Sequence, residues 1–242
     1  MAVIQQIVSA KAQSRKLLVV LVDPDKSAAV EAVCPYLSQA DMVLVGGSTG
    51  DQCEACVAQL RLCTDRPILL FPGNIAQFTP AADALLFLSL LNARTPDVLI
   101  LPHIQIAQHV LQSGIEVIPM GYILVDGDRK SSVEIATKCT PIPQHNIHEI
   151  VSTAVAGQLL GKQLIYLEAG SGAQTPISAE IIRAVRAQLT IPLIVGGGIT
   201  TPEVMLRAFE AGADVVVIGN YFEQNPDEIG NFVRIKRENY GE

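Results

Sequence analysis

The chain has 242 residues, of which 49% are hydrophobic and 17% are charged, and its formal net charge is −7. The apolar fraction excludes an intrinsically disordered chain, and the acidic balance argues against a sequence-independent nucleic-acid binder, which needs a cationic face. We therefore expect a folded protein with no nucleic-acid partner. A small anion held by backbone amides is compatible with this charge.

The first 16 residues have the pattern of an amphipathic helix and lack the basic and then apolar order of a signal peptide. The longest apolar runs, Lys16–Val22 and Ala84–Leu91, are far shorter than the ~20 residues that a membrane span needs. We therefore expect a cytoplasmic protein.

Eight short, β-rich apolar runs alternate with longer segments of helical spacing. Nearly every run is apolar on successive residues, which is typical of parallel strands covered on both faces. The expected strands are Leu17–Val22, Met42–Val45, Pro67–Phe71, Ala84–Phe87, Glu116–Leu124, Leu164–Leu167, Ile191–Val195 and Val215–Ile218. The expected helices between and after them are Ser27–Ser38, Gln52–Leu62, Ala93–Gln112, Ile147–Leu160, Ser178–Gln188, Pro202–Glu210 and Pro226–Arg237.

This alternation predicts an α/β fold, a (β/α)8 TIM barrel that forms a single domain over residues 1–242, at about 30 residues for each βα unit. One unit departs from the pattern. Between Phe71 and Ala84 the chain reads PGNIAQFTPAAD, which is too short and too interrupted by proline and glycine for a crossover helix. We expect a modified barrel whose third helix is missing or replaced by a loop or strand.

The five cysteines are scattered along the chain. Cys53 and Cys56 form a C-x-x-C pair, but Cys53 opens a helical pattern, and neither a second pair nor a nearby histidine completes a zinc site. We expect reduced thiols on or under helices rather than metal or redox chemistry.

Acidic residues and glycines follow the first two strands, where the active site of a barrel lies. Asp23 and Asp25 come after the first strand and suit Mg²⁺, which prefers one or two carboxylates together with substrate phosphate oxygens. A turn with Asp25 as a helix cap is an equally good interpretation of that residue. The segment Gly46–Gly50 after the second strand contains Ser48, whose hydroxyl suits a metal or phosphate shell as well as a turn.

Glu168 ends the sixth apolar strand, so its carboxylate is expected in the barrel mouth. A carboxylate there is unfavourable unless it is paired or used, which makes Glu168 the best general-base candidate in the chain. The alternative is a structural carboxylate paired with a neighbouring cation. Gly170-Ser171-Gly172 follows and offers amides and a hydroxyl to an anion.

Glycines also follow the last two strands, at Gly196-Gly197-Gly198 and at Gly219-Asn220. Two such loops form the phosphate site common to many barrels, where amides converge near a helix N-terminus. The alternative is that the glycines only turn the chain. None of the four histidines has a partner at metal or catalytic spacing.

Taken together, these segments resemble one family. Val22-Asp23-Pro24-Asp25-Lys26, Gly46-Gly47-Ser48, Tyr166-Leu167-Glu168-Ala169-Gly170-Ser171-Gly172-Ala173, Val195-Gly196-Gly197-Gly198-Ile199 and Ile218-Gly219-Asn220 are similar to the signature of geranylgeranylglyceryl phosphate synthases and the related bacterial PcrB proteins. The resemblance spans the chain from the first strand to the last, and the family's fold is a modified barrel whose third helix is replaced.

The resemblance implies a prenyltransferase that joins sn-glycerol 1-phosphate to a polyprenyl diphosphate, with geranylgeranyl diphosphate as the expected donor and Mg²⁺ as the cofactor. It gives catalytic roles to Glu168 and Tyr166 and places the metal on Asp23 and Ser48. The residues it assigns to glycerol phosphate are Tyr166, Leu167, Glu168, Ala169, Gly170, Ser171, Gly172, Gly196, Gly197, Gly198, Gly219 and Asn220. It also implies a homo-oligomer, a dimer or a hexamer, with a peripheral membrane contact for product release.

The chain departs from the family at two positions. Leu21 stands where some members have a basic residue that meets the phosphate, and Ala169 stands where others have an aromatic residue. A prenyl tail needs a long apolar groove, which the aromatic residues and leucines of Phe71–Leu91 are expected to line, with ordinary barrel packing as the alternative. Two other functions stay open. One is another phosphate-binding barrel enzyme, such as a sugar-phosphate isomerase or a synthase of the thiamine phosphate type, and the other is a non-catalytic phosphometabolite-binding protein.

Overall fold

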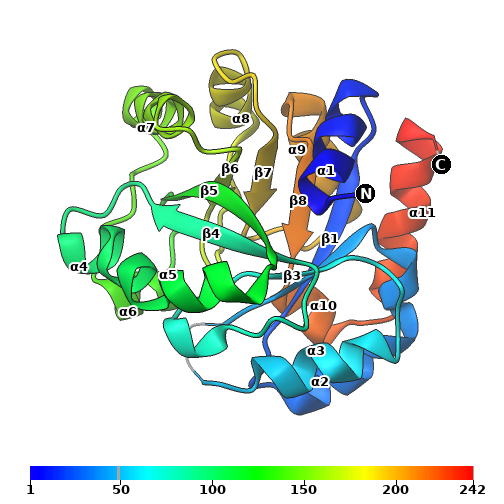
Figure 1. The fold of residues 1–242 in the computed structure, drawn as a ribbon. Helices are drawn as coiled ribbons and strands as arrows, with labels where there is room; N and C mark the ends of the chain where they lie inside the picture. The colour runs from blue at the N-terminus through cyan, green and yellow to red at the C-terminus, as the bar shows by residue number, and fades with distance from the viewer. Residues whose placement is uncertain (48–49, 242) are drawn as a thin grey trace.

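Eight parallel strands close into a barrel in the computed structural model, which describes residues 1–47 and 50–241 (Figure 1). The strands pair in chain order, and β1 closes the ring on β8 with Leu17 opposite Val215. The strands are β1 (Leu17–Val22), β2 (Met42–Val45), β3 (Ile68–Leu70), β4 (Ala84–Leu90), β5 (Glu116–Leu124), β6 (Leu164–Glu168), β7 (Leu193–Gly196) and β8 (Val215–Ile218). The barrel expected from the sequence is confirmed.

Two hydrophobic clusters explain why the strands are apolar on successive residues. Along β1, Leu17 and Val19 belong to a cluster that fills the barrel, whereas Leu18 and Val20 belong to a cluster between the strands and the outer helices. Side chains alternate across a strand, so a strand covered on both faces needs apolar residues at every position.

Helix α1 (Val3–Ala12) lies at the amino end of the strands. Its buried residues Val3 and Ile7 join the cluster inside the barrel. The carboxylate of Glu116, the first residue of β5, accepts hydrogen bonds from the backbone N–H groups of Val3 at 2.6 Å and Ile4 at 2.9 Å. These bonds satisfy donors that a helix N-terminus leaves unpaired, and they fix α1 at the amino end of the barrel.

The remaining helices surround the barrel or lie in the loops at its carboxyl end. They are α2 (Ser27–Val33), followed by a 3₁₀ helix (Cys34–Gln39), α3 (Cys53–Arg61), α4 (Pro96–Leu99), α5 (Leu101–Ser113), α6 (Ser132–Thr137), α7 (Ile147–Leu159), α8 (Ala179–Arg186), α9 (Pro202–Ala211), α10 (Asn220–Gln224) and α11 (Glu228–Tyr240).

The missing third helix is also confirmed. Between β3 and β4 the chain forms only a 3₁₀ turn, Ile75–Gln77. The side-chain oxygen of the buried Gln77 accepts hydrogen bonds from the N–H groups of Gly73 at 2.8 Å and Gly47 at 3.4 Å. These bonds tie the strip to the loop after β2.

Helix boundaries are where the sequence was least informative. The single helix expected over Ala93–Gln112 is two helices, α4 and α5, separated at Ile100. Each has a proline in its first turn, Pro96 in α4 and Pro102 in α5, and proline favours the start of a helix over its interior. The short helices α6 and α10 were not expected. They occupy loop positions at the carboxyl end of the barrel and bear on the site.

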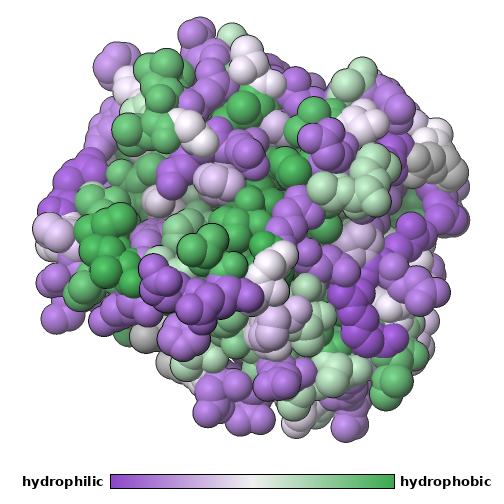
Figure 2. Space-filling model, in the orientation of Figure 1, coloured by the Kyte–Doolittle hydropathy of each residue, from purple (hydrophilic) through white to green (hydrophobic). Residues whose placement is uncertain are grey.

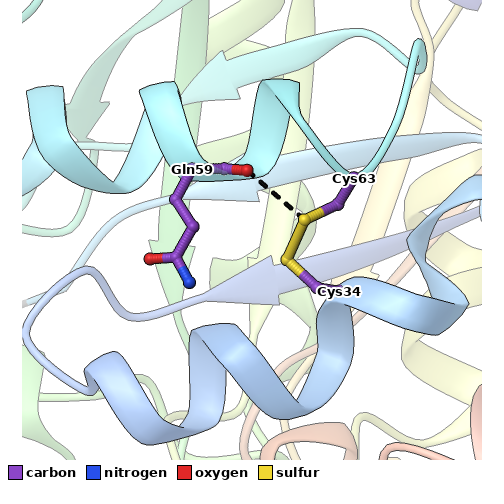
Figure 3. The surroundings of a disulfide bond; sticks show 3 residues. All are labelled: Cys34, Gln59 and Cys63. Atoms are coloured by element: carbon purple, nitrogen blue, oxygen red, sulfur yellow. Dashed lines mark hydrogen bonds between the residues drawn. A yellow bond between two sulfur atoms is a disulfide. The ribbon is translucent and has the colours of Figure 1, made fainter.

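The prediction of reduced thiols is wrong for two cysteines. Cys34, at the end of α2, and Cys63, just beyond α3, form a disulfide with their Cα atoms 5.3 Å apart (Figure 3). The helices of consecutive βα units are neighbours in the barrel wall, which the 29-residue separation alone does not reveal. The other three cysteines, Cys53, Cys56 and Cys139, are buried free thiols. Burial raises the pKa of Cys53 to about 11 and that of Cys56 to about 12, so both are unreactive at neutral pH.

Within residues 1–47 and 50–241, no helix is both long enough and apolar enough to cross a membrane.

Candidate active site

The candidate residues of β1, β6, β7 and β8 gather at the carboxyl end of the barrel. Glu168 is the last residue of β6 and lies in register with Gly196, the last residue of β7. Asp23 directly follows β1, and Gly219 directly follows β8. Because the strands are parallel and closed, these positions share one mouth.

Glu168 is buried at this mouth, with 7% of its surface exposed. Its Oε1 accepts a hydrogen bond from the N–H of Gly170 at 2.8 Å. Burial raises the pKa of Glu168 above the ordinary carboxyl value, although hydrogen bonds from the Tyr166 hydroxyl and the Gly170 amide oppose the shift. A carboxylate held in place with an increased proton affinity is suited to act as a general base.

Tyr166 lies one layer below Glu168 inside the barrel. Its ring packs against those of Tyr122 and Phe71, with centroids 5.4 and 5.6 Å away. Burial and the neighbouring Glu168 raise the pKa of Tyr166 well above its usual value, so the hydroxyl stays protonated and able to donate. A Cβ at Gly196 would lie only 2.3 Å from this hydroxyl oxygen. The glycine therefore makes room for the tyrosine.

The loop after β7 approaches Glu168 through a second glycine. Gly197 has φ +84°, a conformation that other residues rarely adopt, and a Cβ there would lie 2.4 Å from Glu168 Oε1 and 2.8 Å from the Gly170 nitrogen. The backbone of the triple glycine is thus packed directly onto the carboxylate and the loop after β6.

The loops after β6 and β8 also meet. The side-chain amide of Asn220, the first residue of α10, donates to the Ser171 hydroxyl at 2.8 Å. The glycine loops and Asn220 are therefore brought together, as the sequence predicted. Leu167 and Ala169 differ from their neighbours, because their side chains pack in the outer cluster, away from the barrel interior. Only their backbone atoms can face a ligand in the mouth.

Asp23 is held by a network of polar contacts that joins its own loop to α10. The carboxylate of Glu223, on α10, accepts hydrogen bonds from the Asp23 N–H at 3.1 Å and from Lys26 Nζ at 2.7 Å. Lys26 Nζ also lies 3.6 Å from Asp23 Oδ2. Glu223 stands 200 residues from Asp23 in the chain, and nothing in its local sequence indicates this contact. The network joins the loop after β1 to the helix that follows β8.

The donor set around Asp23 fits Mg²⁺ bound together with a phosphorylated ligand. Asp23 Oδ1 lies against Gly47 of the loop after β2, where a Cβ would be only 2.6 Å away. No cluster of three or more histidine, cysteine or acidic side chains that could hold a metal occurs in the described part of the chain. Mg²⁺ needs no such cage, because it keeps waters and takes one or two carboxylates with phosphate oxygens. Ser48, the second predicted ligand, lies outside the described residues.

One side of the mouth is apolar. Partly buried apolar side chains border the cluster inside the barrel. They come from β1, the end of β3, α4 and α6, and they include Leu21, Phe71, Val98, Leu99 and Val133. Figure 2 shows hydrophobic residues gathered over β4 and around α4 and α5. The exposed ones around α4 and α5 include Ile100, Leu101 and Ile104. Of the three aromatic residues expected to line a groove, only Phe71 borders this cluster. Phe78 and Phe87 pack against the outer cluster, which is the ordinary barrel packing given as the alternative.

Two known proteins resemble this chain over nearly its full length. Geranylgeranylglyceryl phosphate synthase of Zunongwangia profunda is 44% identical over 227 residues, which cover 91% of this chain and 97% of that protein. The crystal structure of (S)-3-O-geranylgeranylglyceryl phosphate synthase from Thermoplasma acidophilum in complex with sn-glycerol-1-phosphate matches with a TM-score of 0.90 at 30% identity, covering 98% of this chain and 99% of that one.

Other barrel proteins share the fold with this chain at much lower sequence identity. Thiamine phosphate pyrophosphorylase from Pyrococcus furiosus has a TM-score of 0.53 at 12% identity, covering 93% of this chain and 98% of that one, so the likeness is one of fold alone. The sequence profile of the PcrB family, in contrast, matches residues 10–236. With that match and the relative at 44% identity, the chain belongs to the PcrB family.

Proposed function

We propose that this protein is a prenyltransferase that joins sn-glycerol 1-phosphate to a polyprenyl diphosphate, with geranylgeranyl diphosphate as the expected donor. The observation that carries the proposal is Glu168, a buried carboxylate with a raised pKa, enclosed by the glycine loops after β6 and β7. The relative at 44% identity is named for this activity.

The glycine loops bind the phosphate of the acceptor. The amides proposed for this role are those of Ser171, Gly172, Gly196–Gly198, Gly219 and Asn220, whereas the Gly170 N–H already donates to Glu168 Oε1. Backbone N–H groups at such loops bind phosphate without side-chain charge. Fixing the phosphate presents one glycerol hydroxyl to Glu168 and to the allylic carbon of the donor, which removes most of the entropic cost of bringing the reactants together.

Glu168 then acts as the general base. The glycerol oxygen attacks the allylic carbon, its proton passes to the Glu168 carboxylate, and the bond between that carbon and the diphosphate oxygen breaks. The products are the ether and free diphosphate. Tyr166 orients the carboxylate through its hydroxyl. We propose that it also contacts the glycerol hydroxyls.

The departing diphosphate is neutralised at the loops after β1 and β2. Asp23 and Ser48 would hold Mg²⁺, which when bound supplies the positive charge that a diphosphate leaving group needs. Glu223 and Lys26 orient the Asp23 loop through the contacts described above. The expected consequence is that Asp23→Asn raises the Mg²⁺ concentration needed for half-maximal turnover.

The prenyl tail lies along the apolar side of the mouth. Phe71 and Leu99 line its start, and the exposed side chains of Ile100 and Leu101 continue it toward the surface. We further propose that the exposed part of α4 and α5 is covered in solution, either by a second copy in a dimer or hexamer or by peripheral contact with a membrane during product release.

The test is transfer of labelled sn-glycerol 1-phosphate into an organic-extractable product, measured with a panel of prenyl diphosphates and with and without Mg²⁺. We expect label in the organic phase only with an allylic diphosphate, with mass detection identifying the ether. If all label stays aqueous with every donor, while glycerol phosphate still binds, the protein is a different phosphate-binding barrel or a non-catalytic binder.

A further inference from the structure

The loop between β5 and α6 is fixed against the loop after β6. The carbonyl oxygen of Gly127 accepts hydrogen bonds from the N–H groups of Gln174 at 2.9 Å and Thr175 at 3.1 Å. The Thr175 hydroxyl donates to the carboxylate of Asp128, and the Asp128 N–H donates to Asp126 Oδ1 at 2.9 Å. Asp128 itself has φ +59°, so this turn adopts a special conformation that its hydrogen bonds maintain.

The next residue along this loop is Arg129, whose guanidinium reaches the glycine loop. Its Nη1 donates to the carbonyl oxygen of Gly172 at 3.4 Å. A Cβ placed on Gly172 would lie 3.3 Å from this Nη1 and 3.8 Å from Asn220 Nδ2. The two nitrogens are therefore at most about 7 Å apart, on the side of Gly172 where a side chain would project.

Both donors lie within 4 Å of the same point, the position of a Gly172 Cβ, so one anion of phosphate size can contact both of them. Because Gly172 has no side chain, the space between Arg129 and Asn220 is not filled by the residue beneath it. The guanidinium has five N–H donors, so a single long bond to the Gly172 carbonyl leaves others for a ligand.

Arg129 differs from the other donors around the glycine loops because it is positively charged. The glycine loops offer neutral donors, namely amides, the Ser171 hydroxyl and the Asn220 side chain. On the β1 side, the Leu21 side chain lies 3.4 Å from the position of a Gly219 Cβ. The loop after β8 therefore faces an apolar side chain there and not a charged one. A dianionic phosphate in a protein of net charge −7 is bound more tightly when a cation contributes.

We propose that Arg129 is a phosphate-binding residue that closes the acceptor site opposite Asn220 and supplies the positive side-chain charge for the phosphate of glycerol phosphate. The inference rests on the proposed function for the identity of the ligand. A planar guanidinium forms paired hydrogen bonds to phosphate oxygens, and its exposed position lets it release the Gly172 carbonyl when the ligand arrives.

The test uses the full chain and two probes, sn-glycerol 1-phosphate and inorganic phosphate, titrated by calorimetry at constant ionic strength. Arg129→Ala and Arg129→Gln are each expected to raise the Kd of both probes about tenfold, a loss typical of one charge-assisted contact. Arg129→Lys keeps the charge but loses the paired hydrogen bonds, so it is expected to raise both Kd values by less than Arg129→Gln does. The matched control is Lys130→Ala, the neighbouring cation in the same loop, which leaves both Kd values within twofold.

Arg129→Gln removes the charge and keeps a polar side chain with an N–H donor. Wild-type affinity in that variant would overturn the inference. In turnover assays we expect the KM for glycerol phosphate to rise in Arg129→Gln, while kcat and the KM for prenyl diphosphate change by less than twofold. A fall in kcat with no change in either KM would also refute it.

The two proposals fail in different ways. If Arg129→Gln weakens binding of inorganic phosphate but the wild-type protein transfers no prenyl group, the proposed function is wrong and the anion site stands. If the wild-type protein turns over and the variant binds both probes normally, only the inference about Arg129 is wrong.

Discussion

Replacement of Glu168 by glutamine tests the chemistry at the barrel mouth with little change in shape. The glutamine side-chain oxygen can still accept the 2.8 Å hydrogen bond from the Gly170 N–H, and its amide can donate to the Tyr166 hydroxyl oxygen. The glycine loops should therefore stay in place. We expect the Kd for glycerol phosphate to stay within about threefold of the wild-type value.

Turnover should fall sharply, because glutamine cannot accept the proton of the glycerol hydroxyl. A positioned general base contributes about 10²–10⁴ in rate, so kcat should fall by that factor, which corresponds to about 3–5 kcal/mol of activation free energy. The matched control is Glu180→Gln on α8, an exposed carboxylate, which should leave kcat unchanged. Wild-type kcat in Glu168→Gln would remove Glu168 from the base role.

The same substitution has an expected effect on stability, and its sign follows from the pKa. Because burial raises the pKa of Glu168 in the folded state, ionisation of this carboxyl disfavours folding once the pH exceeds its ordinary value near 4.5. Below that pH the group is protonated in both states and contributes no penalty. Thermal unfolding of Glu168→Gln should therefore occur at an equal or higher temperature than wild type at pH 7–8, with the difference vanishing toward pH 4. A lower Tm at pH 7 would contradict the account.

Other expected outcomes address the surrounding loops. Asp23→Asn should raise the Mg²⁺ requirement in the transfer assay, and an unchanged Mg²⁺ titration would exclude Asp23 as a ligand. Gly197→Ala should lower turnover at least tenfold, because the new Cβ would lie 2.4 Å from the Glu168 carboxylate. The control is Gly161→Ala, which has the same φ of +84° but no atom within 4 Å of the new Cβ, so it introduces the backbone strain without the steric clash. Cys34→Ser should lower the free energy of unfolding by about 3.5 kcal/mol, the chain-entropy estimate for a cross-link over 29 residues, in denaturant titrations without reductant. Equal stability of variant and wild type would mean that the disulfide does not form in solution.

Much of the fold follows from the sequence because a closed parallel barrel leaves a simple pattern. Strands buried on both faces are apolar at successive positions, and the run from Leu17 to Val22 is both the expected and the observed β1. The absence of the third helix also follows from the sequence, because the segment after Phe71 is short and is interrupted by proline and glycine. The ends of helices and short helices such as α10 depend on tertiary packing and on capping contacts, so they are hard to predict from the sequence.

The site was predictable where chemistry is local and not where it depends on distant contacts. Glu168 stands out because a carboxylate at the end of an apolar strand is unusual. Glu223 and Arg129 do not, because each acts on a loop that is far away in the chain and close only after the barrel closes. The disulfide of Cys34 was missed for the same reason.

The most direct test of the central claim is a structure of this protein with sn-glycerol 1-phosphate bound. We expect the phosphate between the loops at Gly197 and Gly219, with Arg129 in contact and a glycerol hydroxyl within hydrogen-bonding distance of Glu168. The chain offers a clear alternative in a pocket of about 550 Å³ between the loop after β4 and the segment around Lys138, lined in part by Arg94, Lys138 and Glu149. Density for the ligand in that pocket, with the barrel mouth empty at saturating concentration, would contradict the account.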